Sequence, residues 1–415
     1  MSKTTSGVPG SSWLPRRRRR ETPCDHSARG YRNLGALALA LTLVTGCATP
    51  DAGTKFLTDL RQHRARGAFI RGVPSFSVPA SQDDVAALAA VSRFQHRSTS
   101  TRETQQWIHE NSRGLPPQEV LSLYARSFGL WAAATRGSLD GLRIRVAGGA
   151  PVIVRLQADA LDASTRKTAI VVGYDDECRR LCLRTSERYV VMAYADFVSA
   201  WRAQGNWMLV IAPPKAGWPL DGDEFAARGD LYASLGKPDL AAGDYQAALK
   251  AAAQEPSPLF VKLGNAYRDM HSTGLAEDAY RRAIEADANN ARAYNNLAWL
   301  LAERSNNLTE AVALARQAIV LSPADPLALD TLGFALFQQG DFKHAAEFLE
   351  QARAKAENLD TETRTEIGIR LATAYLRDGQ GQLAEQVVRD LLKIASRRRL
   401  PKELQALIPR DAQRH

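Results

Sequence analysis

A small residue recurs along the second half of the chain at nearly constant spacing. Gly229, Gly264, Ala298, Gly333 and Ala372 stand 35, 34, 35 and 39 residues apart. Each is followed three positions later by a large residue, at Tyr232, Tyr267, Leu301, Leu336 and Tyr375. A small residue lets two helices approach closely, and a unit of this length holds one helical hairpin that must bury its apolar face against its neighbours. The pattern predicts an all-α array of about five stacked units over residues 222–395, the last one looser than the others.

These units resemble the tetratricopeptide repeat. A second small residue comes about twelve positions after the first, at Ala241, Ala276, Ala311, Ala345 and Ala384. Pro323 and Pro326 break the chain between the third and fourth units. Five matched units favour this solenoid over the alternative, an unrelated helical bundle.

The resemblance implies a concave groove lined by the first helix of each hairpin. Side chains expected on that face by helical spacing include Lys262, Asn265, Arg292, Asn296 and Trp299. Asn265 and Asn296 match two asparagines that bond the backbone of a bound peptide in peptide-clamping members of the family. The basic residues that hold a C-terminal carboxylate there are replaced by Val261, Leu327 and Thr331. The array is expected to bind a peptide or protein without a carboxylate clamp, although both asparagines could instead serve the packing of the repeat.

The N-terminal segment has the pattern of an export signal. Residues 1–46 hold eight basic residues against Glu21 and Asp25, a net +6 of the chain's +9, so the remaining +3 does not indicate nucleic-acid binding. The apolar run Leu34–Gly46 is shorter than the roughly 20 residues that span a membrane. Its end, VTGC, resembles the lipobox of bacterial lipoproteins, in which the cysteine is acylated. The resemblance implies a lipid on Cys47 and an outer-membrane location facing the periplasm; an ordinary secretory signal is the alternative.

Export also bears on whether the two later cysteines are expected to form a disulfide. Cys178 and Cys182 flank a three-residue turn between two apolar strands. In an oxidising compartment the expectation is a disulfide that pins this hairpin, with free thiols as the alternative. The C-x₃-C spacing without a nearby histidine does not indicate a metal site, and no cofactor is expected.

Residues 70–213 combine helices with apolar strands. The order of GVPSF, VAALAAV, GGAPVIVRLQ, AIVVGYDD and FVSAW followed by NWMLVIAPP resembles the bacteriocin-processing (double-glycine) cysteine peptidase-like family. That resemblance implies an α+β papain-like domain ahead of the repeats. The predicted segments are a signal peptide, a linker, this domain, a second linker, the repeats and a basic tail, at 1–46, 47–69, 70–213, 214–221, 222–395 and 396–415.

The catalytic positions of that family are replaced in this chain. Its chemistry needs a thiolate at a helix N-terminus and a histidine on a facing strand. The resemblance places Asp83 at the cysteine, Val78 at an upstream glutamine, and Lys167 at the histidine, or Thr168 if the match shifts by one residue. We therefore expect an inactive domain, in which Asp83 could pair with Lys167.

Together these features predict an outer-membrane lipoprotein that acts as a peptide- or protein-binding scaffold. The alternative is an active peptidase or other hydrolase with an unrecognised set of catalytic residues.

Overall fold

The computed structural model describes residues 51–62, 66–75, 83–95, 99–112, 115, 117–157, 160, 167–185, 188–251, 256–305, 307–394, 396 and 399–408. These residues form two compact units that interleave along the sequence. The first unit contains the described residues up to Phe94 together with 136–207, and the second contains 95–135 together with the residues from 208 onward. Within the described ranges, no helix is both long enough and apolar enough to cross a membrane.

The first unit is built on antiparallel strands. β3 (Val152–Arg155), β4 (Thr168–Asp175), β5 (Arg180–Arg184) and β6 (Tyr189–Ala193) pair in chain order. β1 (Gly67–Phe69) pairs with the end of β4, while β3 pairs with its start. β4 is almost wholly buried, because α3 (Asp83–Phe94) and α6 (Leu139–Ala147) also pack against it. α7 (Tyr194–Arg202) contacts β5 and β6.

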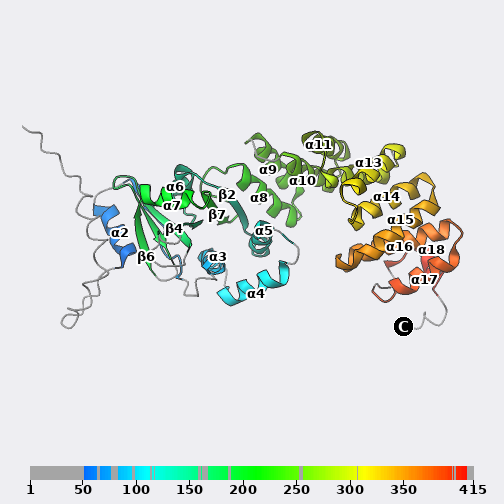
Figure 1. The fold of residues 1–415 in the computed structure, drawn as a ribbon, viewed down its shortest axis with the longest axis horizontal. Helices are drawn as coiled ribbons and strands as arrows, with labels where there is room; N and C mark the ends of the chain where they lie inside the picture. Colours follow the sequence, from blue (N-terminus) through cyan, green and yellow to red (C-terminus); the bar gives the residue numbers. More distant parts are fainter. Residues whose placement is uncertain are drawn as a thin grey trace, which may run out of the picture. The chain divides into compact units, whose positions relative to one another are not determined.

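The segment expected as a linker at 47–69 carries folded structure in its described part. α2 (Ala52–Gln62) buries Phe56 and packs against β6, as Figure 1 shows at the blue end of the described chain. Arg180 ties this helix to the sheet, because its guanidinium pairs with Asp59 of α2 at 3.2 Å and with Asp175 of β4 at 3.1 Å. The segment therefore belongs to the first unit.

The β4–β5 turn corrects the prediction for the cysteines. The Asp175 carboxylate accepts hydrogen bonds from the backbone N–H groups of Glu177 and Cys178, both at 3.1 Å, and so closes the turn. Cys182 lies beyond the turn in β5, with a fully buried, free thiol. The prediction of a Cys178–Cys182 disulfide is therefore wrong: the side chain of Cys182 packs in the core, while Cys178 lies in the turn. Burial raises the pKa of the Cys182 thiol above its usual range.

The second unit begins with two helices and two neighbouring strands. These are α4 (Thr101–Asn111), α5 (Pro117–Ser127), β2 (Trp131–Arg136) and β7 (Trp207–Ala212). A capping box between Ser100 and Glu103 starts α4. The indole N–H of Trp131 donates to the carbonyl of Pro213 at 2.8 Å, which fixes the chain directly after β7. The N-terminal half of the chain thus contains both sheet and helices, as predicted.

Five helical hairpins follow and confirm the predicted repeats (Figure 1, green to orange). Their helices are α8 (Gly222–Ser234) with α9 (Pro238–Lys250), α10 (Pro256–Asp269) with α11 (Thr273–Ala286), α12 (Ala291–Glu303) with α13 (Leu308–Leu321), α14 (Pro326–Gln339) with α15 (Phe342–Lys355), and α16 (Thr361–Arg377) with α17 (Gly381–Leu391). The recurring small residue lies at the crossing within each hairpin: a Cβ on Gly229 would lie 2.6 Å from the ring of Tyr245.

The range predicted as a basic tail also has structure in its described part. α18 (Lys402–Gln405) follows the last hairpin. Leu400, Leu404 and Ile408 are buried in the same apolar cluster as residues of α16 and α17. This short helix covers apolar surface that the last repeat would otherwise expose.

Candidate functional site

The first candidate site lies at the N-terminus of α3, where the resemblance places the lost nucleophile. Asp83 is buried there and Asp84 is exposed. The Asp84 carboxylate accepts a hydrogen bond from the Thr168 hydroxyl at the start of β4, and pairs with Arg155 of β3 at 2.6 Å. A carboxylate is also favoured at this position by the helix dipole.

In this geometry the contact between α3 and β4 is made one residue later in each element than the sequence suggested, by Asp84 and Thr168 instead of Asp83 and Lys167. Lys167 is exposed, and no ion pair between Lys167 and Asp83 is present among the described contacts, so the suggested Asp83–Lys167 pair is wrong. Asp84 and Thr168 are the residues that meet. Consecutive helix residues point about 100° apart, so only one of two adjacent acids can face the strand. Val78 lies outside the described residues, as does Cys47.

The Asp84 carboxylate at the start of α3 is engaged by a cation. Arg155 pairs with Asp84, and its guanidinium lies 4.3 Å from the centroid of the Trp207 ring. The described histidines are His109, His271 and His344, all of them in the second unit. The described part of the chain also has no group of three or more metal-ligating side chains.

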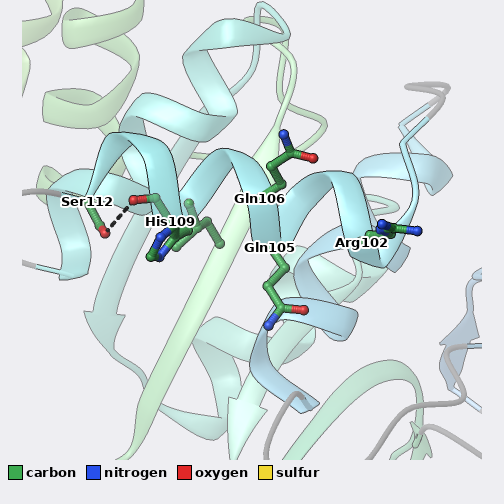
Figure 2. Close-up of a pocket in the computed structure, with 6 residues that line it drawn as sticks. Arg102, Gln105, Gln106, His109 and Ser112 are labelled. Atoms are coloured by element: carbon green, nitrogen blue, oxygen red, sulfur yellow. Dashed lines mark hydrogen bonds between the residues drawn. The ribbon is translucent and has the colours of Figure 1, made fainter.

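An open depression on the second unit follows α4 (Figure 2). It is lined by Arg102, Gln105, Gln106, Ile108, His109 and Ser112. All six come from α4 or the residue that caps it, and the Ser112 hydroxyl is directed to the backbone carbonyl of His109 at 3.5 Å. The lining residues include the His109 imidazole and the Ser112 hydroxyl but no carboxylate or thiol.

The second candidate is the first-helix face, which we define by corresponding positions of α8, α10, α12, α14 and α16. Its members are Asp230, Val261, Lys262, Asn265, Arg292, Asn295, Asn296, Trp299, Leu327, Asp330, Thr331, Phe334 and Arg370. These positions share one side of each helix by the i, i+3, i+4, i+7 spacing.

The two predicted asparagines meet on this face. Asn296 Nδ2 donates to Asn265 Oδ1 at 2.9 Å, and the Tyr280 hydroxyl donates to the same oxygen at 2.7 Å. Asn265 Nδ2 has no partner among the described residues. The Asn296 Oδ1 atom has only a long contact, 3.4 Å, from Asn295 Nδ2. The pair therefore holds one amide donor and one amide acceptor that the fold does not fully use.

The other predicted groove residues differ in their surroundings. Lys262 pairs with Asp230 at 2.9 Å and is thereby neutralised. Trp299 stacks on Phe334 with ring centroids 4.6 Å apart. Arg292 is exposed at the start of α12 and has no ion-pair partner within the described part of the chain.

Arg370 belongs to the same face but was not selected from the sequence. Its guanidinium donates two hydrogen bonds to the Asp330 carboxylate, at 2.8 and 2.7 Å, and lies 5.1 Å from the centroid of the Trp299 ring. Burial raises the pKa of Asp330 above that of an ordinary aspartate, and Arg370 opposes this shift. The repeat alignment could have identified Arg370, because alignment on Ala372 puts it at the position of Asn296. It was missed because the 39-residue spacing made the fifth unit look irregular.

Comparison with known proteins supports the assignment of the repeats. A tetratricopeptide-repeat family model matches residues 261–326. The TPR repeat-containing protein PA4667 of Pseudomonas aeruginosa is 37% identical over 76 residues, which are 18% of this chain and 13% of that protein. The chain thus matches only a small part of this relative's length.

Solved structures with similarity to this chain include MamA and two that are titled TPR proteins. MamA is 22% identical, covering 40% of this chain and 92% of its own, with a TM-score of 0.34. YrrB, titled a TPR protein with an unusual peptide-binding site, is 16% identical over 45% of this chain and 90% of its own, with a TM-score of 0.35. A thermophilic TPR protein of Thermus thermophilus is 19% identical, covering 45% of this chain and 95% of its own, with a TM-score of 0.36. With the family match, the repeat spacing and the five hairpins, the C-terminal region is an array of tetratricopeptide repeats.

Proposed function

We propose that this protein is a binding scaffold whose repeats hold an extended polypeptide on the first-helix face. The observation that carries the proposal is the Asn265–Asn296 pair. Every peptide group offers one N–H donor and one C=O acceptor. The pair offers the complement, a donor at Asn265 Nδ2 and an acceptor at Asn296 Oδ1.

The surroundings of the pair favour binding energetically. Tyr280 holds Asn265, and Asn265 holds Asn296, so little side-chain freedom is lost when a ligand binds. Each new hydrogen bond contributes about 0.5–1.5 kcal/mol net. The half-buried Trp299 adds aromatic surface one helical turn from Asn296.

The proposal also includes residues 70–213 and the location of the protein. We infer that residues 70–213 form an inactive relative of the double-glycine peptidases, supported by the order of the sequence motifs and by the Asp84–Thr168 contact at the helix start where the resemblance places the nucleophile. We further infer that the protein is anchored through lipidated Cys47 in the outer membrane and faces the periplasm. The VTGC motif after a short apolar run supports this location.

Capture from an envelope extract tests the scaffold. The affinity of the full chain with Asn265→Ala and Asn296→Ala for its partner should fall by between about fivefold and a hundredfold relative to the parent protein, since two hydrogen bonds are lost. A matched control, Gln351→Ala with Gln386→Ala, removes two exposed amides from the second helices α15 and α17 and should change nothing. Circular dichroism must show that both variants remain folded. Unchanged capture by the asparagine variant would contradict the proposal.

Inactivity of residues 70–213 has a separate test. The purified chain should not cleave a peptide that carries a double-glycine leader, because Asp84 is paired with Arg155 and Asp83 and Lys167 stand where the resemblance places the cysteine and the histidine. Cleavage that disappears with Asp83→Ala or Asp84→Ala would instead establish the alternative, an active hydrolase.

A further inference from the structure

The charges on the first-helix face restrict what it can bind. Lys262 is paired with Asp230 at 2.9 Å, and Arg370 with Asp330 at 2.7 Å. A carboxylate taken out of water needs a cation that is not already neutralised. Arg292 is uncommitted, but it is an exposed side chain at the start of α12, and an exposed ion pair contributes only about 0.2–1 kcal/mol. The centre of the face is therefore unsuited to an acidic group or a chain end.

Several members of the first-helix face are uncharged or apolar. Val261 lies one turn before Asn265, and Thr331 is buried with its hydroxyl donating to the carbonyl of Leu327 at 2.9 Å. Leu327, at the start of α14, is 40% exposed and presents a large aliphatic side chain. Trp299 and Phe334 continue this surface through their stacked rings.

One polar atom in this region lacks a partner. Asn295 Oδ1 is buried and accepts no hydrogen bond from the described residues, although Asn295 lies directly beside the pair. A buried acceptor without a donor costs about 1–3 kcal/mol. A backbone N–H group brought against α12 would remove that cost, whereas a carboxylate brings no donor.

From these three observations we infer that the face takes an internal, uncharged stretch of a partner protein with an aromatic or large aliphatic side chain. The inference rests on the proposed function and specifies its ligand. The backbone of the stretch hydrogen-bonds to Asn265 and Asn296. Its large side chain packs on Trp299 and Leu327. A free C-terminus is not required.

Two libraries of random 12-residue peptides on phage test the inference with the full chain immobilised. In one library the peptide is fused at both ends, and in the other it ends in a free carboxylate. We expect enrichment in the first library of sequences rich in aromatic or large aliphatic residues and poor in acidic ones. The best peptide is then synthesised with a fluorescent label, and its Kd is measured by anisotropy with a free and with an amidated C-terminus.

Amidation should leave the Kd within about twofold. Trp299→Ala should weaken binding at least about tenfold, as truncation of a central aromatic commonly does. Trp299→Phe should retain most of the affinity if the loss comes from the ligand contact rather than from folding. Leu327→Lys should weaken binding, while the control Val320→Lys, at a 70% exposed position in α13, should not.

Binding that is lost on amidation and with Arg292→Ala would overturn the inference and assign the face to a chain end. If neither library yields a ligand while capture from the envelope extract still depends on Asn265 and Asn296, the inference fails and the scaffold stands. If that capture is also independent of the two asparagines, the proposed function itself fails.

Discussion

At the scale of the residue, Arg370 joins three consecutive first helices. It projects from α16, pairs with Asp330 of α14 and lies over Trp299 of α12. Asp330 is 3% exposed, so its charge depends on this partner. Loss of one member of a buried pair leaves the other charge uncompensated, at a cost of about 3–5 kcal/mol.

Arg370→Ala should therefore lower the free energy of unfolding by about 3–5 kcal/mol, measured by urea denaturation. Arg370→Ala with Asp330→Asn should recover a large part of this loss, because no buried charge remains. The matched control is Arg282→Ala, which removes an ion pair with Asp278 whose side chains are both more than half exposed, and should change stability by less than about 1 kcal/mol. Equal losses in the two single variants would contradict the buried pair.

The same pair predicts a pH dependence. Burial raises the pKa of Asp330, and Arg370 lowers it again. A carboxyl whose pKa is raised by folding favours the folded state at low pH, and this contribution is lost as the pH rises through the folded-state pKa. Without Arg370 the pKa rises further, so the loss of stability in Arg370→Ala should be smaller at about pH 4.5 than at about pH 7. A loss that does not vary with pH would show that Asp330 is not the cause.

The candidate site was predictable to about one residue. Repeat alignment put Asn265 and Asn296 on the same side of their helices, where the two side chains do meet, because a fixed spacing fixes the side of the helix. No such repeat exists at α3, where a shift of one residue decides whether Asp83 or Asp84 faces Thr168. The Cys178–Cys182 pairing failed for a related reason: sequence proximity does not show that Cys182 packs in the core.

At the scale of the element, each hairpin depends on close contact between its two helices. Gly264 in α10 lies against the Tyr280 ring, and a Cβ there would overlap it. Gly243 also lies inside a helix, α9, but an added Cβ would meet no atom within 4 Å. A substitution at Gly264 therefore tests the close packing of the two helices, whereas a substitution at Gly243 tests helix propensity alone.

Gly264→Ala should destabilise the array by about 1–3 kcal/mol, because the added methyl displaces the Tyr280 ring. Gly243→Ala should stabilise it by about 0.5–1 kcal/mol, because alanine loses less backbone entropy in a helix. Thermal unfolding followed by circular dichroism checks both. A stabilising Gly264→Ala would show that the hairpins do not need a small residue at the crossing.

Short elements with distant partners were not predictable from the sequence. α2 and β1 were expected as a linker, because a helix of 11 residues and a strand of 3 give weak patterns. What holds them is remote along the chain: Asp59 pairs with Arg180, and Gly67 pairs with Asp175. The repeats were predictable because each hairpin packs mainly on its neighbours in sequence.

At the scale of the whole molecule, both units are discontinuous in sequence. The first takes residues from either side of 95–135, and the second joins 95–135 to the residues from 208 onward; only the repeats within the second unit are continuous. An interrupted unit needs contacts between distant segments, and periodicity reports only local ones. The sequence therefore indicated a sheet-containing half and a repeat half but not the way in which the two units interleave.

The location of the whole molecule depends on Cys47, which lies outside the described residues. If VTGC is a lipobox, Cys47→Ser should leave an unprocessed or soluble precursor, because the thiol that carries the lipid is gone. The parent protein should partition into detergent and stay with the membranes in high salt, since buried acyl chains contribute about 0.8 kcal/mol per CH₂ and are not screened by ions. Cys24→Ser is the matched control: this cysteine precedes the apolar run, so its loss should leave processing and membrane association unchanged. Immunoblots of membrane and soluble fractions that show normal processing and anchoring of Cys47→Ser would contradict the lipobox prediction and leave the binding role of the repeats to be placed elsewhere.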